Sequence, residues 1–139
     1  MRRQIVNRRI LFADDEEMLT ILGKTALEQL GYKVTTVADG VTALAMFTDE
    51  PNRFDIVITD QTMPQMTGEN LARQILEIRP DMPIILCTGY CSTIDESKAR
   101  TLGIKELMLK PVQMGHLATM VRELLDSAKS KNLPVPTNN

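Results

Sequence analysis

Short apolar runs that alternate with segments of helical periodicity constrain the fold of this chain more than any other feature. Four of the runs lack the strict polar alternation of a half-exposed strand, so they are expected to be strands buried on both faces. They span residues 10–13, 56–59, 84–87 and 107–109. A further strand is expected at 33–37, where β-branched residues indicate an edge or near-edge position.

Helical patterns lie between these strands. They are expected over 17–30, 41–48, 93–102 and 114–128, with another helix that begins after Thr67-Gly68 and ends before Pro80. The apolar stripe of the first helix is expected to comprise Leu19, Leu22, Ala26 and Leu30. The helix at 93–102 has few apolar anchors, so it is expected to be loosely held. Repeated alternation of strand and helix predicts an α/β fold, a doubly wound parallel sheet with helices on both faces.

Length and charge narrow the class of protein. A chain of 139 residues suits one domain, expected over 9–128 between an N-terminal arm or cloning remnant at 1–8 and a flexible tail or linker at 129–139. Lysine and arginine number 16 against 18 acidic residues, so no overall field draws the chain to nucleic acid or an anionic membrane. No stretch approaches the roughly 20 apolar residues of a membrane span, and no secretory signal precedes the domain, which predicts a cytoplasmic protein.

The cysteine and histidine content argues against a disulfide or a zinc site. Cys87 ends an apolar run and Cys91 follows four positions later, so a buried thiol and a loop thiol are expected. The only histidine, His116, is expected to be a partly exposed residue of the last helix.

Polar residues collect at the predicted carboxyl ends of the strands, where doubly wound sheets bind their ligands. They are Asp14, Asp15 and Glu16 after the first strand, Asp60 after the third in chain order, Thr88-Gly89 after the fourth and Lys110-Pro111 after the fifth. Converging carboxylates repel one another, and a hard divalent cation such as Mg²⁺ relieves that repulsion. The alternative interpretation of Asp14 and Asp15 is that they only cap the first helix.

Neither Thr88 nor Lys110 indicates a site by itself. Thr88 is also explained as a residue of a turn, and Lys110 is also explained as an ordinary surface lysine. A hydroxyl and a cation that face a carboxylate cluster together describe a site for a phosphoryl group. In such a site a carboxylate is the nucleophile, the metal and the lysine neutralise the phosphoryl oxygens, and the hydroxyl donates to one of them.

With these residues in place, the chain resembles the response-regulator receiver family of two-component signalling systems. The resemblance is carried by ILFADDEE at 10–17, DIVITD at 55–60, Met63-Pro64 followed by Gly68, Thr88-Gly89 and Lys110-Pro111. It implies a flavodoxin-like sheet of strand order 2-1-3-4-5 and a cis peptide bond between Lys110 and Pro111.

The resemblance also implies a role for each site residue. Asp60 is the implied phosphoacceptor, Asp15 a direct metal ligand, Asp14 an acidic contact acting partly through water, the Thr62 carbonyl a further metal ligand, Thr88 the switch hydroxyl and Lys110 the phosphoryl-contacting lysine. The implied cofactor is Mg²⁺, with Mn²⁺ as an acceptable substitute.

By the same resemblance, the phosphoryl donor is a phosphohistidine of a sensor histidine kinase or of a histidine phosphotransfer domain. The phosphorylated domain then switches conformation to regulate a partner or an attached domain. It is a signalling module rather than an enzyme, because it catalyses only its own phosphorylation and dephosphorylation. No nucleic acid or membrane partner is expected, and a homodimer is compatible with the family. A stand-alone regulator and a receiver of a hybrid sensor kinase are both allowed, and the run 60–90 is most similar to the latter.

The chain departs from the family pattern at one position. Three residues before Lys110 the family usually has a tyrosine or phenylalanine that turns inward on phosphorylation, and this chain has Leu107. The loosely held 93–102 helix is therefore expected to be the moving element. Tyr90, together with Thr62, is expected to tune dephosphorylation rather than to replace the missing aromatic.

Three alternatives to the receiver interpretation fit the sequence less well. A metal-dependent phosphatase with an aspartyl nucleophile often needs a second acid two positions later, where this chain has Thr62, and it needs a cap domain. A degenerate receiver that only binds partners is disfavoured because no residue of the phosphoryl site is missing. A complete histidine kinase is excluded because the chain lacks an ATP-binding segment.

Overall fold

The computed structural model describes residues 8–89 and 94–132, with side chains described up to residue 127. Its strands are β1 (Arg9–Ala13), β2 (Lys33–Val37), β3 (Ile56–Asp60), β4 (Ile84–Thr88) and β5 (Glu106–Leu109). Its helices are α1 (Glu17–Gln29), α2 (Gly40–Asp49), α3 (Gly68–Ile78), α4 (Glu96–Leu102) and α5 (Met114–Asn132). The strands form one parallel sheet in the order β2-β1-β3-β4-β5, which confirms the predicted α/β fold and strand order.

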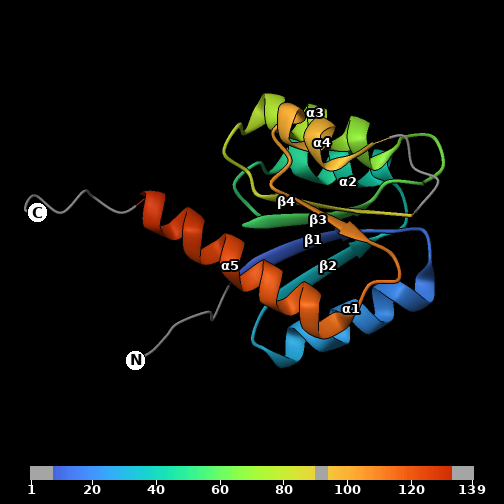
Figure 1. Ribbon diagram of the computed structural model, residues 1–139, viewed down its shortest axis with the longest axis vertical. Coiled ribbons are helices and arrows are strands. Elements are labelled where there is room, and N and C mark those ends of the chain that lie inside the picture. Colours follow the sequence, from blue (N-terminus) through green and yellow to red (C-terminus); the bar gives the residue numbers. More distant parts are fainter. Residues whose placement is uncertain (1–7, 90–93, 133–139) are drawn as a thin grey trace, which may run out of the picture.

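The sheet lies between two layers of helices, with α1 and α5 on one face and α2, α3 and α4 on the other (Figure 1). Alternate residues of each strand point to opposite faces, so each buried strand supplies both layers. In β1, Leu11 and Ala13 pack with α2 and α3, whereas Ile10 and Phe12 pack with α1 and α5. This two-sided burial explains why the strands lack polar alternation.

The predicted apolar stripe of α1 is correct only in part, because Leu19 and Ala26 are half-buried but Leu22 and Leu30 are exposed. Leu22 and Leu30 are 50% and 43% exposed, and the helix is instead buried through Thr20, Gly23 and Leu27. The reason is Phe12, whose ring projects from β1 so far that a Cβ on Gly23 would collide with it. Gly23 can therefore lie directly against this ring, whereas Leu22 and Leu30 turn toward solvent and Leu27 is buried.

Smaller differences concern the ends of elements. Asp60 and Thr88 are the last residues of β3 and β4 rather than the residues that follow them, and α5 continues to Asn132 instead of ending at 128. Cys87 is a buried free thiol, as predicted, and Cys91 lies outside the described residues. His116 is exposed on α5.

The helix α4 has few buried anchors, as predicted, and that it is loosely held stays a prediction. Within it only Ala99 is buried, and it begins at Glu96 behind the capping side chain of Asp95, whereas 93 lies outside the described residues. An ion pair from Lys98 to the largely buried side chain of Glu69, at 3.5 Å, ties it to α3. None of the helices in the described part of the chain is both long and apolar enough to cross a membrane.

Gly68 lets α3 begin directly against the carboxyl end of the sheet. A Cβ at this position would overlap the backbone oxygen of Asp60 and would lie 2.6 Å from Cδ1 of Leu86. The Gly68 N–H donates to the carbonyl oxygen of Gln61 at 3.0 Å, which closes the loop between β3 and α3. The close approach of helix and strand therefore depends on the missing side chain.

We predict that Gly68→Ala lowers the free energy of unfolding by about 1–3 kcal/mol, because the new methyl group meets backbone that cannot move without displacing α3. Gly115→Ala is the matched control, since a Cβ there meets nothing within 4 Å and the position is helical. That variant should gain about 0.5–1 kcal/mol. Urea denaturation of the three proteins measures both effects, and equal stability of the two variants would contradict the packing argument.

Candidate functional site

Strand order brings the polar residues of four strand ends to one edge of the sheet. β1 and β3 are neighbours with Ala13 opposite Thr59, so Asp14 and Asp60 lie side by side. The N–H of Asp14 donates to the carbonyl of Val37 at 3.0 Å, which holds Asp14 in line with the sheet. The strand order reverses at β1, which has β2 on one side and β3 on the other, and ligands usually bind at such a point in these folds.

Three carboxylates meet at this edge. Asp14, Asp15 and Asp60 each place one oxygen within 4.8 Å of the others. Asp14 and Asp60 are buried, at 2% and 3% exposed, whereas Asp15 is exposed. The two residues that follow β1 thus contribute a buried and an exposed carboxylate to the same group.

Lys110 brings a positive charge to this group from the end of β5. Its Nζ lies 3.0 Å from Oδ1 of Asp60 and 4.0 Å from Oδ2 of Asp14. The same Nζ lies 3.0 Å from Oε1 of Glu16. Sequence reasoning counted Glu16 among the acidic residues but assigned it no role, because no spacing rule connects residues so far apart in the chain.

Burial dominates the electrostatics of the two inner carboxylates. It raises the pKa of Asp14 to about 6, an effect that the hydrogen bond from the Glu16 N–H reduces and the charge of Asp60 increases. Oδ2 of Asp14 is buried and has no hydrogen-bond partner among the described residues. Burial also raises the pKa of Asp60, against the hydrogen bond from Lys110 that lowers it. Both carboxylates therefore carry their charge at a cost in free energy.

The lysine stays charged in this setting. Burial alone would lower the pKa of Lys110, but its hydrogen bonds to Asp60 and Glu16 outweigh burial and the pKa is raised. The charged ammonium of Lys110 therefore lies next to Oδ1 of Asp60.

The other predicted site residues that the structure describes lie in β4, in β5 and in the loops that follow β3 and β5. Thr88 is buried and its hydroxyl donates to the carbonyl of Gly89 at 3.3 Å, while its own carbonyl accepts from the N–H of Lys110 at 2.8 Å. The peptide bond between Lys110 and Pro111 is cis, as predicted, and Pro111 is exposed. Thr62 is exposed in the loop after β3, and Leu107 is half-buried against the core under α3 and α4. Tyr90 lies outside the described residues.

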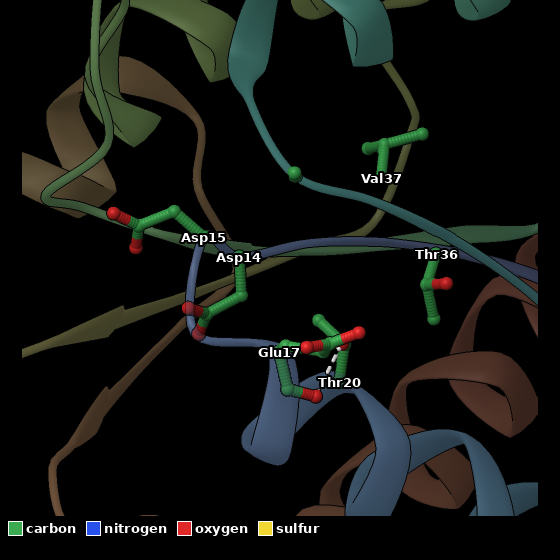
Figure 2. Close-up of a pocket in the computed structure, with 7 residues that line it drawn as sticks. Asp14, Asp15, Glu17, Thr20, Thr36 and Val37 are labelled. Carbon is green, nitrogen blue, oxygen red and sulfur yellow. Dashed lines mark hydrogen bonds between the residues drawn. The ribbon is translucent and has the colours of Figure 1, made fainter.

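A cavity and a groove flank the carboxylates. A polar cavity of about 280 Å³ lies between β2 and the start of α1, lined by Asp14, Asp15, Glu17, Thr20, Thr36, Val37 and Ala38 (Figure 2). On the other side, a more apolar groove of about 530 Å³ is lined by Glu16, Met18, Leu19, Leu22, Gly89, Lys110, Pro111 and Val112. The site is therefore open to solvent between α1 and the loop after β5.

This geometry suits a carboxylate that acts as a nucleophile and a group of carboxylates that binds a metal ion. A buried carboxylate beside a fixed ammonium is a nucleophile whose product can be neutralised by that ammonium. Clustered carboxylate oxygens are ligands for hard divalent cations. The sequence predicts these groups at strand ends, and the fold gathers them: Asp14, Asp15 and Asp60 each place an oxygen within 4.8 Å of the others, and Nζ of Lys110 lies near Asp60 and Asp14.

Comparison with known proteins agrees with this geometry. Residues 10–122 match the sequence profile of the response regulator receiver domain. The chain is 34% identical over 122 residues to the response regulator receiver protein CpdR of Brucella abortus, a match that covers 87% of this chain and 99% of that protein. It is 33% identical over 120 residues to the sensor kinase CckA of the same organism, where the match covers 84% of this chain and 12% of the kinase.

A solved structure shows the same fold. The response regulator receiver domain protein from Clostridium thermocellum superimposes with a TM-score of 0.83 at 32% sequence identity, and the match covers 88% of this chain and 98% of that one. The profile match extends over most of the chain, from β1 into α5. The chain therefore belongs to the response regulator receiver domain family, in which a phosphoacceptor role in two-component signalling is general.

Proposed function

We propose that this chain accepts a phosphoryl group on Asp60 and that the modified state regulates a partner or an attached domain. The observation that carries the proposal is the 3.0 Å contact between Nζ of Lys110 and Oδ1 of Asp60 within a buried carboxylate group. The donor is a phosphohistidine of a sensor histidine kinase or of a histidine phosphotransfer domain. The chain catalyses this transfer, and the later hydrolysis, on itself alone.

The transfer step follows from the positions of these groups. An oxygen of the Asp60 carboxylate forms a bond to phosphorus as the phosphorus–nitrogen bond breaks, and the imidazole nitrogen leaves with the electron pair. Lys110 neutralises one phosphoryl oxygen. The hydroxyl of Thr88 exchanges its long bond to the Gly89 carbonyl for a bond to another phosphoryl oxygen.

The residues at this edge fit a divalent metal ion. The donors are carboxylate oxygens, and Oδ2 of Asp14 is a buried acceptor without a hydrogen-bond partner among the described residues. We assign Mg²⁺, or Mn²⁺ in its place, to Asp14, Asp15, Asp60 and the backbone carbonyl of Thr62. When bound, the ion supplies positive charge to the phosphoryl oxygens and to the carboxylates.

The groove beside Lys110 is the proposed approach of the donor. Met18 and Leu22 on α1 are 69% and 50% exposed, which gives the rim of the groove an apolar character. A phosphohistidine that enters there reaches Asp60 along the side chain of Lys110. The match to a sensor kinase favours a receiver attached to such a kinase, and the match over nearly all of CpdR favours a separate regulator. Thr62 and Tyr90 would tune the lifetime of the phosphoryl group.

The first test of this function is the site of labelling. Wild-type protein incubated with acetyl phosphate and Mg²⁺ should gain the mass of one phosphoryl group, and Asp60→Asn should gain none. Lys110→Ala should label at least tenfold more slowly, because the charge that offsets the phosphoryl oxygens is lost. Intact-mass spectrometry measures all three proteins, and undiminished labelling of Asp60→Asn would refute the assignment.

The second test concerns the crowded carboxylates. Burial raises the pKa of Asp14 to about 6 in the folded state, above its ordinary value of 3.8, so its ionisation opposes folding above pH 6 and this penalty disappears as the pH falls toward 4. Asp14→Asn should therefore stabilise the metal-free protein at pH 7.5 by about 1–3 kcal/mol, with the gain shrinking toward pH 4.

Added Mg²⁺ should reverse this order, because it stabilises the wild type by binding the folded state and binds the variant less well. Asp15→Asn is the control, since Asp15 is exposed and should yield a smaller gain. Thermal melting from pH 4 to 8, with and without Mg²⁺, measures the effect. A metal-free Asp14→Asn protein that melts below wild type at pH 7.5 would show that repulsion does not limit the site.

The third test concerns the readout. Leu107 has no hydroxyl and exposes little distinctive surface in either rotamer, so α4 is the proposed moving element. Amide exchange in Mg²⁺, with and without beryllofluoride, should change most in α4 and next to Thr88 and Lys110. Leu107→Ala should keep this response. An unchanged α4, or loss of the response in Leu107→Ala while beryllofluoride still binds, would contradict the mechanism.

A further inference from the structure

We propose that Glu16 is a positioning residue that holds part of the positive charge of Lys110 away from the phosphoryl group, and so weakens the affinity of the site for anions. This inference rests on the proposed function and adds a regulator of the same site. It concerns a contact that joins the start of α1 to the end of β5, between residues 94 positions apart.

The ammonium of Lys110 is surrounded by more negative charge than it can neutralise. It lies 3.0 Å from Asp60, 3.0 Å from Glu16 and 4.0 Å from Asp14, which sets one positive charge against three carboxylates. The side chains of Asp14 and Asp60 are 1% and 4% exposed and belong to the reacting group, whereas that of Glu16 is 62% exposed on the outer side. Of these three carboxylates, Glu16 is thus the one that can be substituted without removing a carboxylate of the reacting group.

The side chain of Glu16 has no helix-capping role. Glu16 is the N-cap residue of α1, a position where the side chain usually accepts from a backbone N–H of the first turn, but it makes no such bond. Its own N–H instead donates to Oδ1 of Asp14 at 2.8 Å, which fixes its backbone beside the carboxylates. The carboxylate of Glu16 is left free to reach Lys110.

Phosphorylation increases the negative charge and the number of hydrogen-bond acceptors around Lys110. The ammonium has three N–H groups, and Asp60 and Glu16 already accept from it. A phosphoryl group on Asp60 adds oxygens and negative charge at the same place, so Lys110 must then divide its charge between that group and Glu16. The charge of Glu16 opposes the binding of an anion and favours the binding of a cation.

This opposition gives a signature that a purely structural role cannot produce. Glu16→Gln removes the charge but keeps the length of the side chain and a carbonyl that still accepts from Lys110. It should bind Mg²⁺ alone more weakly and, at saturating Mg²⁺, bind beryllofluoride more tightly. Each change should be on the order of three- to tenfold in dissociation constant at low ionic strength, and both should shrink in about 0.5 M salt.

Two further variants separate the contact with Lys110 from general charge. Glu17→Gln removes the same charge one residue along α1, outside the contacts of Lys110, and should shift both constants by less than half as much. Glu16→Asp keeps the charge and should remain within about twofold of wild type. Calorimetric titration of the folded proteins with Mg²⁺, then with beryllofluoride, measures every constant.

The initial rate of labelling by acetyl phosphate gives an independent readout, and it should rise in Glu16→Gln. Weaker beryllofluoride binding or slower labelling in Glu16→Gln would overturn the proposal, since Glu16 would then be needed to place Lys110 productively. Equal effects of Glu16→Gln and Glu17→Gln would overturn it as well. Failure of the proposed function looks different, because wild-type protein would then take up no label or Asp60→Asn would still be labelled.

Discussion

Charge balance at the carboxyl edge of the sheet is the constraint on which the rest of the site depends. Asp14 and Asp60 are buried next to each other, and burial raises the pKa of both. The ammonium of Lys110 offsets part of their charge, and it can do so only because β5 ends beside β4, where the N–H of Lys110 donates to the carbonyl of Thr88. Oδ2 of Asp14 still lacks a hydrogen-bond partner within the described residues, which leaves the folded protein with a charge that a cation can satisfy.

The packing around this edge combines rigid and weakly held parts. The loop after β3 is pinned because Gly68 lets α3 touch the backbone of Asp60, and Gln61 accepts from the N–H groups of Gly68 and Glu69. On the other side of Thr88 lies α4, which buries only Ala99 along its length. Few buried side chains hold α4, whereas hydrogen bonds fix the loop after β3. The proposed response to phosphorylation of Asp60 is a shift of α4, because this chain has Leu107 where the family usually has an aromatic residue.

Prediction from sequence succeeded for elements whose residue pattern reflects burial. It failed where one side chain of another element determines which residues are buried. The strands were found because burial on both faces removes polar residues from them, and the candidate site residues were placed together because parallel strands end at one edge. The predicted stripe of α1 was only partly correct because the ring of Phe12, on another element, requires Gly23 to face it. The end of α5 was placed too early because residues 129–132 carry no apolar side chain that would extend the helical pattern.

The sequence by itself determined the α/β fold, the strand ends that hold Asp14, Asp60, Thr88 and Lys110, and the receiver family, because these follow from local periodicity and from the order of short motifs. Only the tertiary structure decided which carboxylates are buried and which one meets Lys110 from outside. Asp14 and Asp15 are adjacent in sequence, yet one is buried and the other exposed. Glu16 pairs with Lys110 because folding brings α1 and the end of β5 together, and no local pattern encodes a contact across that separation.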